Sequence, residues 1–396
     1  MIRSCGICLE IITQFFATVK LFGSQESLYG RVNSMKCLAS VFSKYGGLLG
    51  KVAQLLSLDT ETSNVFDDCK PAASEESISY VLNEVMTKEP FVDKIEIEPE
   101  VMKSGSLGQV YKGRLTETNE RVVLKVQFRG IKATFEEDFA VLDFISNYLY
   151  RSVGHLGAAI NDIKEKTREE LDYLNEMNNQ LKITEILKDD PDIHVPKIYK
   201  EFCTHEVIVM EEMVGFKSIP EYMKTASDEE KSRLGNKILK FVMNTFYNHG
   251  IFYSDNHYGN FLVNDNHEIC VLDFGCINYF EPDLLEDIKQ MHRLMLDEDK
   301  EGFLGHLEKM GIMLPTTSPE SREYCYNIFN IQYEPLTQPG FKFTDEWLDK
   351  MSDKDMDLMK DWGLPSGVIY LHKIPWGLYH ILNRLGVTVE ETNYSL

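Results

Sequence analysis

The segment Tyr253-Ser-Asp-Asn-His-Tyr-Gly-Asn260 is followed, across a short stretch that suits a hairpin, by Val271-Leu-Asp-Phe-Gly275. Asp255 and Asn260 are five positions apart, and Asp273 comes 13 residues after Asn260. Because Mg²⁺ prefers hard oxygen ligands, Asn260 and Asp273 are candidate metal ligands. Asp255 is the candidate acid-base group beside them. The order and spacing of these residues decide the fold that we expect.

A glycine-containing loop and a strand that carries a lysine lie upstream of this segment. The loop reads Lys103-Ser-Gly-Ser-Leu-Gly-Gln-Val110, and glycines let a backbone approach phosphate groups closely. The predicted strands 108–115 and 121–128 are joined by the short polar connection TETNE, which suits a hairpin. Lys125 lies in the second strand, where a buried lysine needs a partner. A plain turn and a solvent-facing lysine are the alternatives. The candidate nucleotide-binding residues are Gly105, Ser106, Gly108, Val110, Lys125, Glu211 and Met213.

The acid-rich segment 165–178 is predicted to form a helix that offers a partner for Lys125. Asp172 and Glu176 are one helical turn apart and therefore share a face. We expect Glu176 to pair with Lys125. The alternative is an acidic helix that is simply solvated.

The chain is predicted to be an α+β protein with three regions. Residues 1–90 have a helical pattern, and residues 91–214 combine short strands with inserted helices at 132–188. Residues 215–396 are mainly helical, apart from a loop expected at about 314–345, which is rich in Pro, Thr and Gln. A cleft between a strand-rich lobe and a helical lobe is a natural place for a ligand.

The net charge bears on which partners the chain can bind. The formal value is −22, from 41 Lys and Arg residues against 63 Asp and Glu residues. Such an acidic chain repels nucleic acid backbones, which argues against a nucleic acid partner. A nucleotide is also an anion, so a local pocket of lysine, backbone N–H groups and metal must override this field. The eight cysteines show no framework spacing, which favours reduced thiols and an intracellular protein.

Residues 5–23 are apolar at helical spacing, but Glu10, Gln14 and Lys20 interrupt the run. We therefore expect neither a transmembrane span nor a signal peptide here. A helix docked on its own domain and a peripheral membrane contact are the two alternatives. The expected location is cytoplasmic or peripheral to a membrane, with no organelle assigned.

Together these motifs resemble the UbiB family of atypical kinases, also called AarF-domain kinases, over residues 30–390. Lys51-Val-Ala-Gln54 matches the family's K-x-G-Q motif, and Glu170-Leu-Asp172 matches its E-x-D motif. The segment Tyr253–Asn260 is similar to the family's H-x-D-P-H-P-G-N motif. About 50 residues separate Lys125 from Glu176, which implies inserted helices in the small lobe. This chain departs from the family motifs at Ala53, Tyr253, Asn256 and Tyr258.

The resemblance implies a protein-kinase-like two-lobed fold with an N-terminal helical extension, and ATP and Mg²⁺ as cofactors in an interlobe cleft. It also implies an atypical kinase or ATPase linked to isoprenoid lipid metabolism of the ubiquinone type. A non-catalytic nucleotide- or lipid-binding pseudokinase is one alternative, and an active protein or small-molecule kinase is another. The phosphoryl acceptor, the lipid and the oligomeric state stay open. By this resemblance Lys125, Glu176 and Asp255 are catalytic, while Lys51, Gln54, Glu170 and Asp172 regulate the site.

Overall fold

The described part of the chain, in a computed structural model, forms two compact units. It comprises residues 75–105, 107–149, 164–165, 167–253, 257–352, 358, 362–363, 377–392 and 394. The first unit holds the described residues up to Asn178 together with Lys197–Glu212. The second unit holds Asn179–Pro196 and the described residues from Met213 onward. The helical extension is predicted over residues 1–90, and the part of it before Glu75 lies outside the described residues. The domain limits predicted at 90/91 and 214/215 stay predictions.

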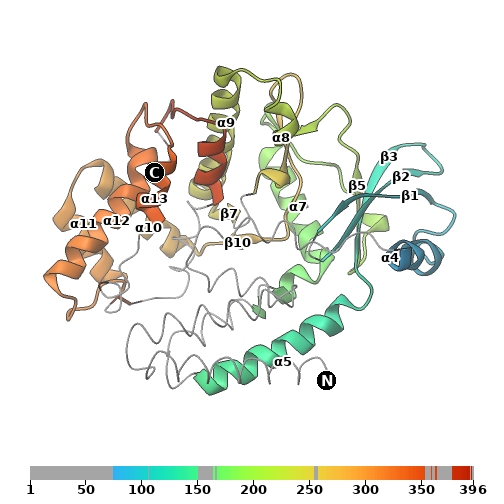
Figure 1. Ribbon diagram of the computed structural model, residues 1–396, viewed down its shortest axis with the longest axis horizontal. Helices are drawn as coiled ribbons and strands as arrows, with labels where there is room; N and C mark the ends of the chain where they lie inside the picture. Colours follow the sequence, from blue (N-terminus) through green and yellow to red (C-terminus); the bar gives the residue numbers. More distant parts are fainter. Residues whose placement is uncertain are drawn as a thin grey trace. The chain divides into compact units, whose positions relative to one another are not determined.

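The first unit is built on a four-stranded antiparallel sheet with the order β1-β2-β3-β5 (Figure 1). The hairpin predicted from the TETNE connection is confirmed, because β2 and β3 pair along their whole length. Val122, Leu124 and Val126 alternate along β3 into the core, which places Lys125 on the opposite face of the sheet. The strands are β1 (Ile95–Ser104), β2 (Gly108–Leu115), β3 (Arg121–Gln127) and β5 (Val207–Glu211).

Helices precede and follow these strands in the first unit. Helix α5 lies between Lys125 and Glu176 in the sequence. The prediction that helical structure is inserted between these two residues is therefore confirmed. The core of this unit includes Phe91, Tyr111 and Leu124, and burying each such side chain contributes roughly 1.5–3 kcal/mol. The helices are α4 (Glu75–Tyr80), η3 (Val81–Val85), α5 (Ile131–Leu149), η4 (Lys200–Phe202) and the first part of α7 (Tyr173–Leu187), whose residues from Asn179 onward belong to the second unit.

The second unit contains two small sheets. One has four strands in the order β4-β9-β8-β6, and the other pairs β7 with β10. In the first of these sheets β8 and β9 form an antiparallel hairpin that pairs Phe261 with Val271. This hairpin links the short helix η5 (Tyr258–Asn260) to the segment that follows β9. The strands are β4 (Ile193–His194), β6 (Lys217–Ser218), β7 (Ile251–Tyr253), β8 (Phe261–Val263), β9 (Ile269–Val271) and β10 (Ile277–Tyr279).

The helices of the second unit surround a large hydrophobic cluster. The longest described helix, α9, begins with a capping box between Ser227 and Glu230. It ends at Gly250, whose φ of 63° is a left-handed value that glycine adopts without strain. The helices are α8 (Ile219–Tyr222), α9 (Asp228–His249), α10 (Pro282–Leu296), α11 (Lys300–Lys309), α12 (Pro319–Thr337), α13 (Asp345–Ser352) and the helical residues 377–384.

The loop predicted at about 314–345 is wrong, because α12 (Pro319–Thr337) occupies most of it. Ser318 caps this helix by accepting a hydrogen bond from the Ser321 N–H, and Pro319 takes the first position, where it loses no helical bond. Cys325, Ile328 and Phe329 then recur at helical spacing and are buried. The Pro and Thr residues mark the start of the helix rather than a long loop.

The described chain therefore mixes helices with separate, open sheets, as an α+β fold does. Among the described residues, no helix is long and apolar enough to cross a membrane.

Candidate functional site

Lys125 on β3 and Glu176 on α7 form an ion pair in the first unit. The Lys125 Nζ atom donates hydrogen bonds to both carboxylate oxygens of Glu176, at 2.7 and 2.8 Å. The Glu176 side chain is 3% exposed and that of Lys125 is 21% exposed. Burying a carboxylate costs free energy unless a partner satisfies its oxygens, and the Lys125 ammonium contacts both oxygens of Glu176. The pairing predicted from the sequence is present in the structure.

Two further side chains hold this pair, and the sequence analysis missed both. The Lys125 Nζ atom lies 5.1 Å from the centre of the buried Tyr173 ring, a cation–π contact. Tyr173 precedes Glu176 by one helical turn, so the two share a face of α7. Gln127, two residues after Lys125 on the same strand face, donates from Nε2 to the Leu171 carbonyl at 2.9 Å. The start of α7 is thereby fixed against β3.

The E-x-D motif lies at the N-terminus of α7. An Asp172 carboxylate oxygen accepts a hydrogen bond from the Leu174 N–H at 3.0 Å, as an N-cap residue does. The same oxygen lies 2.8 Å from His205 Nδ1. Asp172 therefore caps the helix that carries Glu176. Glu170 is half-buried two residues before it, and the regulatory role expected for both residues stays a prediction.

The two glycines of the predicted phosphate loop differ in what their positions require. A Cβ atom on Gly108 would lie 2.2 Å from the Val126 carbonyl oxygen, so the close approach of β3 requires glycine there. Among the described residues, the nearest atom to a Cβ atom on Gly105 would be the Gly108 carbonyl oxygen, at 3.5 Å. The Gly105 N–H donates to the Gly108 carbonyl at 2.8 Å, so this amide is engaged within the loop. Ser106 lies outside the described residues.

Val110 pairs directly with Lys125 across β2 and β3, so the two side chains share a face of the sheet. Glu211 ends β5 with an exposed side chain, and its backbone N–H donates to the Lys197 carbonyl at 2.9 Å. Met213, two residues further on, is half-buried. The roles of Val110, Glu211 and Met213 in nucleotide binding stay predictions.

Glu212, between the two predicted residues at the end of β5, was also missed. Its carboxylate pairs with the Nε atom of Arg121 at 2.7 Å and with Lys112 Nζ at 2.9 Å. Partial burial by itself would raise the pKa of Glu212, but hydrogen bonds from Lys112 and Arg121 hold that pKa below its ordinary value. Glu212 thus ties the end of β5 to β2 and β3.

In the second unit, the β8–β9 hairpin brings the segments of Asn260 and Asp273 together. The Leu272 N–H donates to the Asn260 carbonyl at 3.0 Å, one residue before Asp273. The Asp273 carboxylate accepts from the Gly275 N–H at 2.9 Å, which fixes the turn through Asp273-Phe274-Gly275. Asn260 and Asp273 supply one amide and one carboxylate, a set that leaves room for phosphate oxygens and water on Mg²⁺. Asp255, Lys51 and Gln54 lie outside the described residues.

The Asp273-Phe274-Gly275 turn is anchored by residues that the sequence analysis did not single out. Asn179 donates from Nδ2 to the Phe274 carbonyl at 3.0 Å, and it accepts a hydrogen bond from the Tyr279 hydroxyl at 2.7 Å. The Phe274 ring is fully buried and lies 6.1 Å from the Tyr253 ring. Aromatic burial and one side-chain amide therefore position the segment that carries Asp273.

Tyr253 stands where the family motif has histidine, and it is a core residue of the second unit. Its ring centre lies 5.2 Å from that of Phe241 on α9. Burial raises the pKa of the Tyr253 phenol well above its ordinary value, and the negative charge of the Asp273 carboxylate adds to the shift. The side chain is therefore neutral at physiological pH.

The Lys125–Glu176 pair on a strand and helix, with Asn260 and Asp273 on a hairpin, defines a protein of the kinase-like class. A sequence model described as the ABC1 atypical kinase-like domain matches residues 64–307, more than half of the 396-residue chain. The chain belongs to this family, which confirms the resemblance to the UbiB, or AarF-domain, kinases.

Several relatives support this assignment. Atypical kinase COQ8, mitochondrial, from Saccharomyces cerevisiae is 26% identical over 381 residues, which cover 89% of this chain and 73% of that protein. Protein ACTIVITY OF BC1 COMPLEX KINASE 8, chloroplastic, from Arabidopsis thaliana is 28% identical over 266 residues, which cover 65% of this chain and 34% of that protein. This chain thus spans about a third of the length of that plant relative.

A solved structure shows the same fold. The complex of Rv3197 with erythromycin from Mycobacterium tuberculosis aligns with a TM-score of 0.64 and 20% sequence identity. The alignment covers 89% of this chain and 92% of that chain. At this identity the likeness shows the fold alone, and together with the family match it confirms the predicted α+β, kinase-like class.

Proposed function

We propose that the chain is an atypical kinase or ATPase that binds ATP together with Mg²⁺. Family membership supports the kinase class, and the observation that carries the proposal is the bidentate Lys125–Glu176 pair. When both oxygens of a carboxylate accept hydrogen bonds from a lysine on a strand, the lysine ammonium group is held in one position. In phosphoryl transfer such a lysine contacts the α- and β-phosphates of the nucleotide.

The remaining residues take complementary roles in this proposal. Gly105, Ser106, Gly108, Val110, Glu211 and Met213 contact the nucleotide, and Tyr173 holds the Lys125 ammonium through its ring. Asn260 and Asp273 bind the metal ion, which supplies positive charge to the transferred phosphoryl group. Asp255 takes a proton from the attacking hydroxyl or water. Lys51, Gln54, Glu170 and Asp172 regulate access to the site.

The family resemblance further suggests a link to isoprenoid lipid metabolism of the ubiquinone type, and peripheral membrane contact. We place the protein in the cytoplasm or at a membrane surface. The names of two relatives carry the words mitochondrial and chloroplastic, and those words describe those proteins.

A second candidate is a pseudokinase that binds a nucleotide without turnover. The observation that favours it is the buried, neutral Tyr253 at the position where the family motif has histidine. Tyr253 packs against Phe274 and lacks the imidazole that the histidine of the motif would supply. This candidate predicts nucleotide binding with no release of phosphate.

One experiment separates these candidates. ATP binding by calorimetry and phosphate release are measured for the wild-type chain and for Lys125→Met, with Lys94→Met as a matched control. Lys94 is a surface lysine of the same unit that pairs with Glu89. The proposal predicts binding and phosphate release that Lys125→Met removes and the control keeps. Binding without release supports the pseudokinase, and no binding contradicts both.

A further inference from the structure

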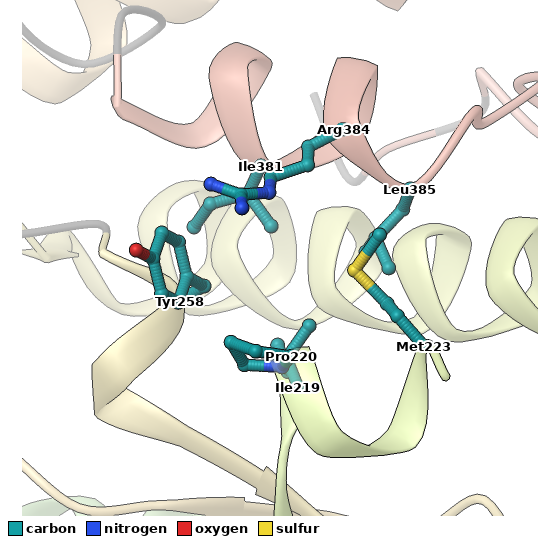
Figure 2. A pocket seen from close by; sticks show the side chains of 7 residues that line it. All are labelled: Ile219, Pro220, Met223, Tyr258, Ile381, Arg384 and Leu385. Atoms are coloured by element: carbon teal, nitrogen blue, oxygen red, sulfur yellow. The ribbon is translucent and has the colours of Figure 1, made fainter. Parts of the chain in front are cut away.

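A stack of three side chains lies on the turn that carries Asn260. The Arg384 guanidinium carbon lies 5.0 Å from the centre of the Tyr258 ring (Figure 2). The Tyr258 ring in turn lies against the His257 ring, with centres 4.2 Å apart and planes inclined by 33°. Arg384 comes from the helical residues 377–384, more than 120 positions after the turn. All three residues belong to the second unit.

The stack acts on the backbone through His257. The His257 Nδ1 atom accepts a hydrogen bond from the Gly259 N–H at 3.1 Å, and the His257 carbonyl accepts one from the Asn260 N–H at 2.9 Å. The ring orientation of His257 therefore sets the first of two bonds that close the η5 turn. Asn260 also contributes its carbonyl to the Leu272 N–H. Holding the ring holds the position of Asn260.

Arg384 is exposed at the end of the helical residues 377–384, and buried apolar side chains lie next to it in the sequence. Ile381 and Leu385, on either side of Arg384 in the sequence, are buried and line a small pocket together with α8 (Figure 2). Figure 2 shows the Arg384 guanidinium reaching across this pocket toward Tyr258. The pocket is lined by Ile219, Pro220, Met223, Tyr258, Ile381, Arg384 and Leu385.

We propose that Arg384 is a positioning residue that fixes the His257–Asn260 turn by holding the Tyr258 ring. A turn of three residues in a 3₁₀ helix has few hydrogen bonds of its own. Proline at position 258 would restrict the backbone directly, whereas tyrosine leaves φ free. In this chain the stack with Arg384 supplies the missing restriction. The consequence for metal binding rests on the function proposed above, but the ordering of the turn does not.

The first test is amide hydrogen exchange at Gly259 and Asn260 in the nucleotide-free chain. These amides exchange when the turn opens, so loss of the cation–π contact raises their exchange rate by about two- to fivefold. We expect the increase in Arg384→Ala and Tyr258→Leu, a smaller increase in Arg384→Lys, and wild-type exchange in Tyr258→Phe, which keeps the ring. The double variant Arg384→Ala/Tyr258→Leu exchanges no faster than Tyr258→Leu, because Arg384 acts through Tyr258.

Arg293→Ala is the matched control, since Arg293 is a helical arginine of the same unit that pairs with Glu286. Unchanged exchange at Gly259 and Asn260 in Arg384→Ala overturns the proposal. Exchange that rises equally throughout the second unit also overturns it, because that result means general loosening of the fold.

The second test is the Mg²⁺ concentration that gives half-maximal ATP binding. Arg384→Ala raises this Mg²⁺ concentration by about two- to fivefold, while the control Arg293→Ala leaves it as in wild type. An unchanged Mg²⁺ requirement beside faster exchange shows that the turn does not position a metal ligand, and it overturns that part of the inference. If the wild-type chain binds no ATP, the proposed function fails, and the exchange measurement still decides whether Arg384 holds the turn.

Discussion

Glu176 holds Lys125 through both of its carboxylate oxygens, at 2.7 and 2.8 Å, although the two residues are 51 positions apart. This bidentate contact fixes a strand of the sheet to the first turns of α7. The Tyr173 ring also contacts the Lys125 ammonium, and Gln127 joins the same strand to the Leu171 carbonyl just before α7. The geometry makes the pair part of the fold of the first unit as well as the centre of its proposed phosphate site.

Glu176→Gln should lower the free energy of unfolding by about 1–3 kcal/mol, because it replaces two hydrogen bonds between a carboxylate and the Lys125 ammonium with weaker contacts to a neutral amide. The value falls below that of a fully buried pair, since the Lys125 side chain is 21% exposed. Urea unfolding measures the change. The matched control is Glu185→Gln on the same helix, where the exposed pair with Lys188 contributes at most about 0.5 kcal/mol. Equal losses in both variants would contradict this account.

Gly108→Ala should lower the free energy of unfolding by about 1–3 kcal/mol, because the added Cβ would collide with the Val126 carbonyl. Gly105→Ala, whose Cβ would lie 3.5 Å from the nearest atom of the part of the chain that the structure describes, should change this free energy by about 0.5 kcal/mol or less. Chemical denaturation of both variants tests this contrast. Wild-type stability in Gly108→Ala would show that β2 and β3 do not approach as closely as the structure has them.

Asp172→Ala should destabilise the protein by about 1 kcal/mol through loss of the α7 N-cap. Asp172→Asn keeps a capping oxygen and should recover most of that loss, although it weakens the contact with His205. Thermal unfolding of the two variants measures the difference. If both variants unfold as wild type does, the E-x-D aspartate has no structural role, and only the predicted regulatory role remains.

His292 should make the protein less stable as the pH falls below 7. Burial lowers the pKa of His292 from 6.5 to about 4, so the unfolded chain binds a proton between these values while the folded chain does not. Stability therefore rises with pH across this window, and acidification from pH 7.5 to 5 costs about 2 kcal/mol at this residue.

The measurement compares urea unfolding of wild type and His292→Gln at pH 7.5 and 5. The glutamine keeps a polar partner for the Tyr247 hydroxyl, which lies 2.8 Å from His292 Nδ1. The other acidic groups affect both proteins alike, so the difference between the two pH dependences belongs to His292. Equal pH dependence in the two proteins would show that His292 titrates normally in the folded state.

The sequence predicts the Lys125–Glu176 pair because both residues belong to patterns with fixed periods. Alternation along a strand places Lys125 on one face, and helical spacing gathers the acids of segment 165–178. Tyr173 is different, because an aromatic residue on an amphipathic helix has the same pattern whether it packs in the core or beneath an ammonium group. Its cation–π contact depends on where α7 packs against β3, and the periodicity of the sequence gives no information about that position.

The errors and omissions elsewhere have similar causes. Pro319 and the threonines near it suggested a loop, yet Ser318 and Pro319 are also the residues that begin a helix, as they do in α12. The strands β4 and β6 have two residues each, too few for any alternation to be recognised. Arg384 reaches Tyr258 from the far end of the chain, and no local pattern records such a contact.

The most direct test of the account is the melting temperature of the protein with ATP, with and without Mg²⁺, in wild type and in Asp273→Asn. Ligand at 100 times its Kd stabilises a folded protein by about 2.7 kcal/mol, which raises the melting temperature visibly. We predict a rise that requires Mg²⁺, disappears on chelation with EDTA and is absent in Asp273→Asn. No rise at millimolar ATP with Mg²⁺, or the same rise in Asp273→Asn, would contradict the proposal that Asp273 binds the metal of a nucleotide site.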